Sequence, residues 1–212
     1  MNMRWLWIIG ILIVWQLPDC FGQCPVKRQD ANHEKTVRKQ VRKYTKKGYE
    51  SPPGLPPLSD QLLCTYATQS QIDTEGNAIY LLSLGSASSK SRNLARIKAV
   101  ELAKLDMANS ISSQVDLEIQ INQKELQLDD KTKTLLKGFA MRYSSQTMQQ
   151  LIGNQVVFEA FRERADGYDY DVRLTIKAAA ALESARMKIR QMLGQQGILD
   201  PIDLDKILPP NG

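Results

Sequence analysis

Two β-prone segments in the last third of the chain, residues 155–164 and 168–177, flank the tripeptide Ala165-Asp166-Gly167. Asp-Gly is a strong signal for the tight turn of a β-hairpin. Successive side chains of a strand point to opposite faces, so strict alternation predicts one apolar and one solvated face. The second segment alternates over its whole length: Tyr168, Tyr170, Val172, Leu174 and Ile176 are interleaved with Asp169, Asp171, Arg173, Thr175 and Lys177. We therefore predict an antiparallel hairpin over residues 155–177 with one buried face.

The segments before and after the hairpin predict one more strand and several helices. Residues 79–84 form a short apolar run between Gly76 and Gly85, which predicts a strand over 78–86 that is buried on both faces. Helices are expected at 58–72, 134–151 and 178–193, and a longer one begins at Arg92. Its apolar residues recur at every fourth position, as on a packing ridge, and the first half of this row is alanine: Ala95, Ala99, Ala103, Met107, Ile111 and Val115.

A small antiparallel sheet covered by helices is an α+β fold. We expect one such domain over residues 58–195, followed by a loosely held C-terminal tail over residues 196–212, although four apolar residues of this tail could dock on the domain: Ile198, Ile202, Leu204 and Ile207. Residues 23–57 are expected to precede the domain as a helix and a connector.

The N-terminus has the order of parts of a secretory signal peptide. Arg4 precedes an apolar run of 11 residues, 5–15, whereas a membrane-spanning helix needs about 20. Pro18 and Gly22 then mark the polar region and the cleavage position, so we expect removal of residues 1–22. The chain is therefore expected to be exported to the periplasm, the outer envelope or the outside of the cell. The sequence contains no second long apolar run, so we do not expect an integral membrane protein.

Cleavage after Gly22 would leave Cys24 and Cys64 in an oxidising compartment. A disulfide between them would close a loop of about 40 residues and contribute up to roughly 4 kcal/mol in the chain-entropy description. Two unpaired thiols, with Cys64 buried in a helix, are an equally compatible outcome. Lipid attachment is a third, although the residue before Cys20 is Asp19 where lipoprotein processing prefers a small residue.

Nearly all of the net charge of +5 lies in one short segment. Residues 23–50 hold nine Lys or Arg against three Asp or Glu, whereas residues 51–212 carry a net charge of −1. Residues 34–47 predict a helix with a narrow apolar stripe of Val37, Val41 and Tyr44, ended by Gly48. The proline-rich residues 51–57 then form an extended connector.

This basic helix has two interpretations. Its apolar stripe could dock on the domain and leave the charges solvated, or its charges could attach the protein to an anionic envelope surface. Each Lys or Arg near a charged membrane contributes about 1 kcal/mol. The second interpretation names six contact residues: Arg38, Lys39, Arg42, Lys43, Lys46 and Lys47. Nucleic acid is the usual partner of such a patch, but the expected export argues against it.

The distribution of reactive side chains predicts no enzyme. The single histidine, His33, lies in the basic segment without the paired His or Cys ligands that zinc requires, so a solvated surface position is expected. The sequence has no glycine-rich phosphate loop and no Gly-x-Ser-x-Gly elbow. As a nucleophile Cys64 would need a base nearby, and the only histidine that could act as that base, His33, lies in a distant polar segment.

Three aspartates around the hairpin turn, Asp166, Asp169 and Asp171, invite a calcium site, because calcium prefers clustered carboxylates. They lack the order of a calcium-binding loop. We expect solvated strand carboxylates that face Arg162 or Arg164 across the hairpin. The sequence therefore predicts no catalytic residue, no cofactor and no metal.

Two further pieces carry a resemblance to a known family. After the first strand and Gly85-Ser86-Ala87, residues 94–103 (LARIKAVELA) run into residues 105–111 (LDMANSI), and residues 166–172 (DGYDYDV) lead into an alanine-rich helix. The stretch 79–193 thereby resembles the LPP-type twenty-kilodalton lipoproteins of bacterial envelopes and, more distantly, the N-terminal domain of flagellar assembly protein T. The resemblance implies an envelope-associated, non-catalytic protein with a helix-plus-sheet fold. It does not cover residues 23–77, and the poor lipidation motif departs from it.

These observations together predict an exported, non-catalytic protein that acts by binding or scaffolding, with an envelope protein or an anionic surface as its partner. Self-association into a homo-oligomer is compatible with this prediction. The alternative is a small-ligand carrier with an apolar pocket between the sheet and the 95–115 helix. An unrecognised hydrolase would require a closed cluster of titratable groups.

Overall fold

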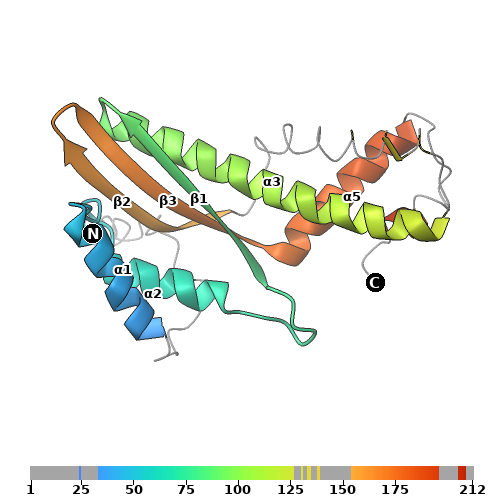
Figure 1. The fold of residues 1–212 in the computed structure, drawn as a ribbon, viewed down its shortest axis with the longest axis horizontal. Helices are drawn as coiled ribbons and strands as arrows, with labels where there is room; N and C mark the ends of the chain where they lie inside the picture. The colour runs from blue at the N-terminus through green and yellow to red at the C-terminus, as the bar shows by residue number, and fades with distance from the viewer. Residues whose placement is uncertain are drawn as a thin grey trace, which may run out of the picture.

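The computed structural model describes residues 24, 33–126, 130, 133–134, 138, 154–195 and 205–208. Its elements are α1 (Glu34–Lys46), α2 (Leu58–Gln69), β1 (Tyr80–Ser89), α3 (Arg92–Leu126), β2 (Gln155–Arg164), β3 (Gly167–Lys177) and α5 (Ala178–Gln195). The strands form one antiparallel sheet in the order β1-β3-β2, with helices packed on it (Figure 1), which confirms the predicted α+β fold. The expected signal peptide and most of the expected helix 134–151 lie outside the described residues.

The hairpin forms where the alternation predicts it. Arg164 pairs with Gly167 across the turn. Gly167 has φ +152°, and a Cβ there would lie 2.4 Å from the Ser89 carbonyl oxygen, so the position requires glycine. The apolar residues of β3 face α3 and α5, and four of them are buried: Tyr170, Val172, Leu174 and Ile176.

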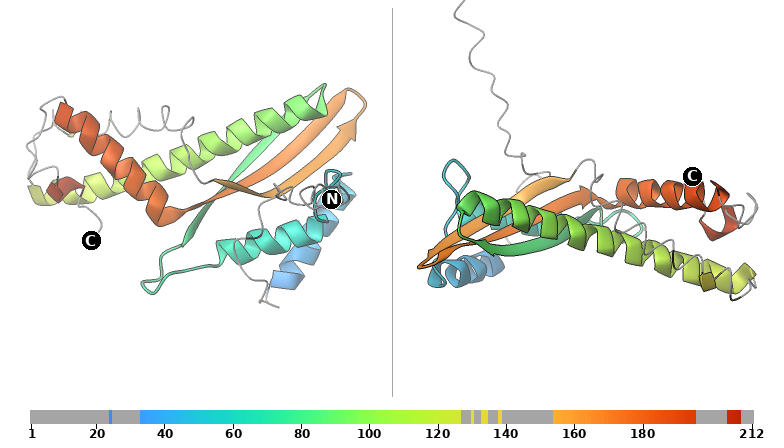
Figure 2. Two further views of the ribbon diagram at one scale, coloured as in Figure 1. Left: turned by 180° about the vertical axis from the view of Figure 1, so that it is seen from behind. Right: turned by 90° about the horizontal axis from the view of Figure 1, so that it is seen from above.

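The fourfold row of α3 is the main packing surface of the protein. Its residues from Ala95 to Val115 are completely buried, and Ile119 extends the row by another turn. The alanine half permits a very close approach of β1, because a Cβ on Gly85 would lie 1.9 Å from the Ala99 carbonyl oxygen. The bulky half runs past the end of the sheet beside α5 (Figure 2).

The described part of the C-terminal tail is docked, so a loosely held end is wrong for residues 205–208, and the docking of Ile207 that the sequence left open is present. Ile207 and Leu208 are completely buried in the same cluster as Ile189 and Leu193 of α5. Asn122 donates a hydrogen bond of 2.8 Å to the Ile207 carbonyl. The burial follows from the length of α3, whose second half offers an apolar surface that none of the described strands covers.

Helix α2, with α1 packed on it, covers part of the second face of the sheet, so the predicted solvated face of β3 is wrong for Asp169 and Thr175, whereas Asp171 and Arg173 are half-buried and Lys177 is exposed. Asp169 and Thr175 are 7% and 1% exposed. A bulge between Val156 and Phe158 shifts the register of β2 by one residue. Phe158 and its neighbours on this face then meet the helices in a second apolar cluster, made of Val37, Leu58, Leu62, Phe158 and Ala160.

Strand β1 differs from the prediction in both length and burial. It continues to Ser89 because Ala87–Ser89 pair with Tyr170–Tyr168 of β3. It is buried on one face only, since Ser83 and Gly85 face α3 whereas Leu84 is 48% exposed. The reason is that β1 lies at an edge of the sheet, and the second apolar cluster, which α1 and α2 form with β2, contains no residue of β1.

Candidate anionic-surface interface

Helix α1 has two chemically different sides. Val37 is buried, and Val41 and Tyr44 pack with it on the second apolar cluster. Because these residues are spaced by four and three along a helix, they share one side, and the opposite side faces solvent. The first interpretation of the sequence, a docked apolar stripe, thus describes one side of α1.

The solvent side carries seven cations, here called the basic face: Lys35, Arg38, Lys39, Arg42, Lys43, Lys46 and Lys47. All seven are exposed. Of these seven, only Arg38 forms an ion pair with another described residue, Glu34 at 3.0 Å, and both side chains are more than half exposed. An exposed pair of this kind is worth at most about 1 kcal/mol. All six residues predicted from the sequence belong to this face.

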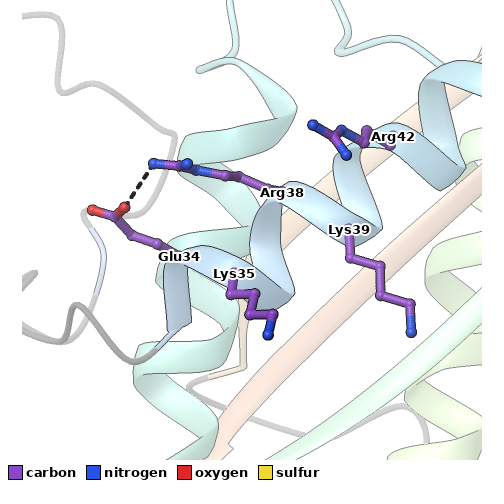
Figure 3. Close-up of a pocket in the computed structure, with 5 residues that line it drawn as sticks. All are labelled: Glu34, Lys35, Arg38, Lys39 and Arg42. Carbon is purple, nitrogen blue, oxygen red and sulfur yellow. Dashed lines mark hydrogen bonds and ion pairs between the residues drawn. The ribbon is translucent and has the colours of Figure 1, made fainter.

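The first two turns of the basic face border a shallow surface hollow of about 540 Å³, whose described lining residues are Glu34, Lys35, Arg38, Lys39 and Arg42. Figure 3 shows these side chains spreading outward from one helix rather than converging on a point, with Arg38 turned to Glu34. The described lining residues include no nucleophile and no paired acid and base. Its geometry suits contact with an extended anionic surface more than enclosure of a small molecule.

The N-terminal end of α1 is anchored to α2. Cys24 and Cys64 form a disulfide, with Cα atoms 5.6 Å apart, which ties the chain before α1 to α2. His33, at the start of α1, stacks on Tyr66 with ring centroids 6.2 Å apart and lies 3.2 Å from the Ser70 hydroxyl. His33 is therefore half-buried in a contact between helices rather than fully solvated as predicted.

The C-terminal end of α1 is anchored to the hairpin. Tyr44 packs against Tyr49 and Phe158 with centroid distances of 5.4 and 5.1 Å. Burial, reinforced by the negative charge of Asp171, raises the pKa of Tyr44 to about 12. Glu50 then exchanges two backbone hydrogen bonds with Phe161 of β2, at 2.8 and 3.0 Å. With both ends fixed, the basic face has a defined orientation on the protein.

Of the three aspartates considered for calcium, Asp169 is held by cations. It accepts hydrogen bonds of 2.6 Å from both the Ser88 hydroxyl and Arg162 Nε, and Arg164 Nε lies 3.2 Å away. Burial acts to raise the pKa of Asp169, but the hydrogen bonds and the two guanidinium groups outweigh it and lower that pKa. The predicted contact of carboxylates with Arg162 and Arg164 is thus present, in a buried setting.

An ion pair between the half-exposed Arg96 and a buried carboxylate, which sequence reasoning missed, joins α3 to β2. Arg96 binds both carboxylate oxygens of Glu159, at 2.6 and 2.8 Å, and the Tyr170 hydroxyl donates a short hydrogen bond to the same carboxylate. Glu159 is 2% exposed. Burial and this hydrogen bond raise the pKa of Tyr170, and the Glu159 contact raises that of Arg96. The only sequence signal was an acidic residue within an apolar run.

The contact of Arg96, Glu159 and Tyr170 supports a role in positioning α3 on the sheet rather than in catalysis. Three donors engage the Glu159 carboxylate, so its oxygens are already satisfied. Within the described residues, no group of three His, Cys, Asp or Glu side chains could hold a metal ion. None of the described helices is long and apolar enough to cross a membrane.

Comparison with known protein families, with curated proteins and with solved structures finds no match for this chain. The resemblance to envelope lipoproteins therefore stays a prediction from the sequence. The ligand-carrier alternative also stays a prediction, but the direct contact of Gly85 with Ala99 leaves no space between sheet and helix at that point.

Proposed function

We propose that this chain is an exported, non-catalytic binding protein of the cell envelope, and that it attaches through the basic face of α1 to an anionic membrane surface. The single observation that carries the proposal is the exposure of seven cations on one side of a helix that is anchored at both ends. Each such cation contributes about 1 kcal/mol near an anionic membrane, which supports a reversible and salt-sensitive attachment.

The rigid anchoring makes the attachment specific in orientation. A flexible basic segment would lose conformational freedom on binding, whereas α1 is already ordered by its disulfide and by its contacts with α2 and β2. Since the apolar stripe is occupied by the protein's own core, α1 contributes charge but no hydrophobic insertion. The expected binding is therefore purely electrostatic.

Co-sedimentation with vesicles tests the attachment. The protein should sediment with phosphatidylglycerol vesicles, stay free with phosphatidylcholine vesicles and be released by added salt. The double variant Lys39→Glu/Lys43→Glu should lose most of the bound fraction. A matched control, Lys177→Glu/Lys188→Glu, makes the same change in net charge on exposed residues elsewhere and should bind normally. Equal loss in both variants would refute an assignment to α1.

The export part of the proposal has its own test. The intact mass of the protein recovered from the cell envelope should correspond to a chain that begins at Gln23, without a lipid. A mass that retains Met1, or recovery from the cytosol, would contradict export. Proximity labelling from the C-terminus of the chain should then report reproducible envelope neighbours, and their absence under every growth condition would count against scaffolding.

A further inference from the structure

The two edges of the sheet differ in how their outward backbone groups are hydrogen-bonded. At the β2 edge, Phe161 exchanges backbone hydrogen bonds with Glu50, and the Glu159 amide donates to the Gln61 side chain at 2.7 Å. Gln61 is itself 2% exposed and is held by bonds to Ser51 and to the Pro56 carbonyl. This edge is therefore closed by Glu50, which follows α1, and by Gln61 of α2.

Among the described residues, no strand pairs with the outer edge of β1. Leu84 donates its amide to the Asp106 carboxylate at 3.2 Å, so its backbone points away from β3. Backbone groups of an antiparallel strand alternate in direction, so a set of five residues points outward with it: Tyr80, Leu82, Leu84, Ser86 and Ser88. In the described part of the chain, Asp106 is the one group outside the sheet that hydrogen-bonds to the backbone of this set.

This strand also lacks the usual protection of an edge. Sheet proteins block exposed edges with Lys, Pro or a bulge, and residues 80–89 contain none of these. Leu84 is 48% exposed beside the free backbone. Leu102 is 44% exposed and lies one helical turn before Asp106, on the same side of α3. Unpaired amides and carbonyls flanked by two exposed leucines have the chemistry that accepts another strand.

We propose that the outer edge of β1 binds an extended peptide segment of a partner protein, which adds a fourth strand to the sheet, with Asp106 as a displaceable plug. In the free protein the carboxylate satisfies the Leu84 amide; in the complex a carbonyl of the added strand takes that amide and Asp106 turns to solvent.

The position of α3 defines the partner. The helix contacts β2 through Arg96 and Glu159, lies directly beneath Gly85 of β1, and reaches the edge at Asp106. It therefore crosses under the sheet and emerges where the new strand would lie. A second copy paired antiparallel through β1 would bring its own α3 into the same space, although helices need 8–10 Å between axes and strands only about 4.8 Å. A peptide without an attached helix avoids this collision.

The same geometry sets the side chains of the peptide. Strand β1 itself has only small residues opposite the alanine half of α3, namely Ser83, Gly85 and Ala87. Strand β3, which crosses α3 to one side of the Gly85 contact, packs large residues on the helix, whereas an added strand would lie where α3 emerges at the edge beside Asp106 and needs small residues at alternate positions there. The sequence of β1 meets this condition, whereas the sequence of β3 places Tyr170, Val172 and Leu174 on that side.

Amide hydrogen exchange of the full mature protein with two synthetic peptides tests the proposal. A peptide with the sequence of residues 80–89 should slow exchange of the outward amides of β1, those of residues 82, 84, 86 and 88, by at least about tenfold at saturation. A peptide with the sequence of residues 168–177 should have no effect. Protection of the inward amides only, equal effects of both peptides, or no protection at all would overturn the proposal.

Three variants sharpen the test. Asp106→Ala should bind the 80–89 peptide several-fold more tightly, because the plug is gone. Leu84→Pro removes an amide that is not part of the ladder with β3, so the fold should persist, as its melting temperature will show, while binding is lost. Leu84→Ala keeps the amide and should bind. Equal binding by the proline and alanine variants, or a β1-linked dimer of Asp106→Ala in native mass spectrometry, would refute an edge that accepts a peptide.

Discussion

Gly85 offers the sharpest test of how the sheet and α3 are packed. A Cβ at this position would lie 1.9 Å from the Ala99 carbonyl oxygen and 2.5 Å from the Ala103 nitrogen. Both atoms belong to the backbone of a helix whose facing residues are completely buried, so no flexible side chain can move aside. In Gly85→Ala the strand and helix must therefore separate by more than 1 Å to restore an ordinary van der Waals contact.

The expected loss of folding stability in Gly85→Ala follows from how short this distance is. Overpacking of a core by one methyl group costs about 1–3 kcal/mol, and the rigid backbone on both sides puts Gly85→Ala at about 3 kcal/mol. Separation also loosens the contacts of Ala95 and Ala103 with the sheet. The loss should be visible as a lower urea midpoint with an unchanged slope, followed by circular dichroism, since all three tryptophans lie within residues 1–15.

Two matched variants make this prediction refutable. Ser86→Ala changes an exposed neighbour on the same strand and should stay within about 0.5 kcal/mol of the wild type. Ala99→Gly should not rescue Gly85→Ala, because the obstacle is the Ala99 carbonyl and not its methyl group. A Gly85→Ala protein with wild-type stability, or full rescue by Ala99→Gly, would show that strand and helix are not in direct backbone contact.

Three further outcomes are expected. The folded-state pKa of Asp169 is depressed, so its ionised carboxylate stabilises the protein above about pH 4, the ordinary range of an aspartate. This stabilisation is lost as the pH falls through the lower pKa of the folded state. Asp169→Asn should remove this acid-dependent part of the urea midpoint, and an unchanged pH profile would contradict the prediction. Tyr170→Phe should cost about 1–2 kcal/mol, because one donor to the buried Glu159 is lost. Glu159→Ala should cost more, about 2–3 kcal/mol, because the buried Tyr170 hydroxyl is left without an acceptor while the half-exposed Arg96 can be solvated; equal effects in thermal melts would argue against the contact of these three residues. Reduction, or Cys24→Ser, should lower stability by up to about 4 kcal/mol and should weaken the vesicle binding of the still-folded protein, because one anchor of α1 is lost; an unchanged melting temperature of the reduced protein would contradict the bond to Cys64.

The sequence predicted the elements whose signals are local. The Asp166-Gly167 turn and the alternation after it define the hairpin within about 20 residues, and the fourfold row from Ala95 defines the buried side of α3. Each signal depends on the geometry of one strand or one helix. Such patterns need no knowledge of distant residues.

The sequence failed where two distant segments decide the result. Asp169 and Thr175 read as a solvated face because nothing near them in sequence shows that α1 and α2 cover it. The Arg96–Glu159 pair joins residues 63 positions apart, and the bulge after Val156 changes which face of β2 each side chain meets. Tertiary contacts of this kind have no local periodicity.

For the candidate site the outcome is similar. The identity of the basic residues, and their position opposite an apolar stripe, could be worked out from residues 34–47 alone. The anchoring of that helix could not, because it depends on His33 meeting Tyr66 and Ser70 of α2 and on Glu50 pairing with Phe161 of β2. The sequence therefore predicted a charged surface and missed its rigidity.

The sheet lies between α1 and α2 on one side and α3 on the other (Figure 1). If α1 rests on a membrane, this layered order turns the outer side of α3 toward the aqueous space. Leu117 and Ile121, which are 58% and 53% exposed there, would then be presented away from the lipid. The molecule would thus work as a spacer with two independent sides, able to hold a membrane and a soluble partner at the same time without competition between them.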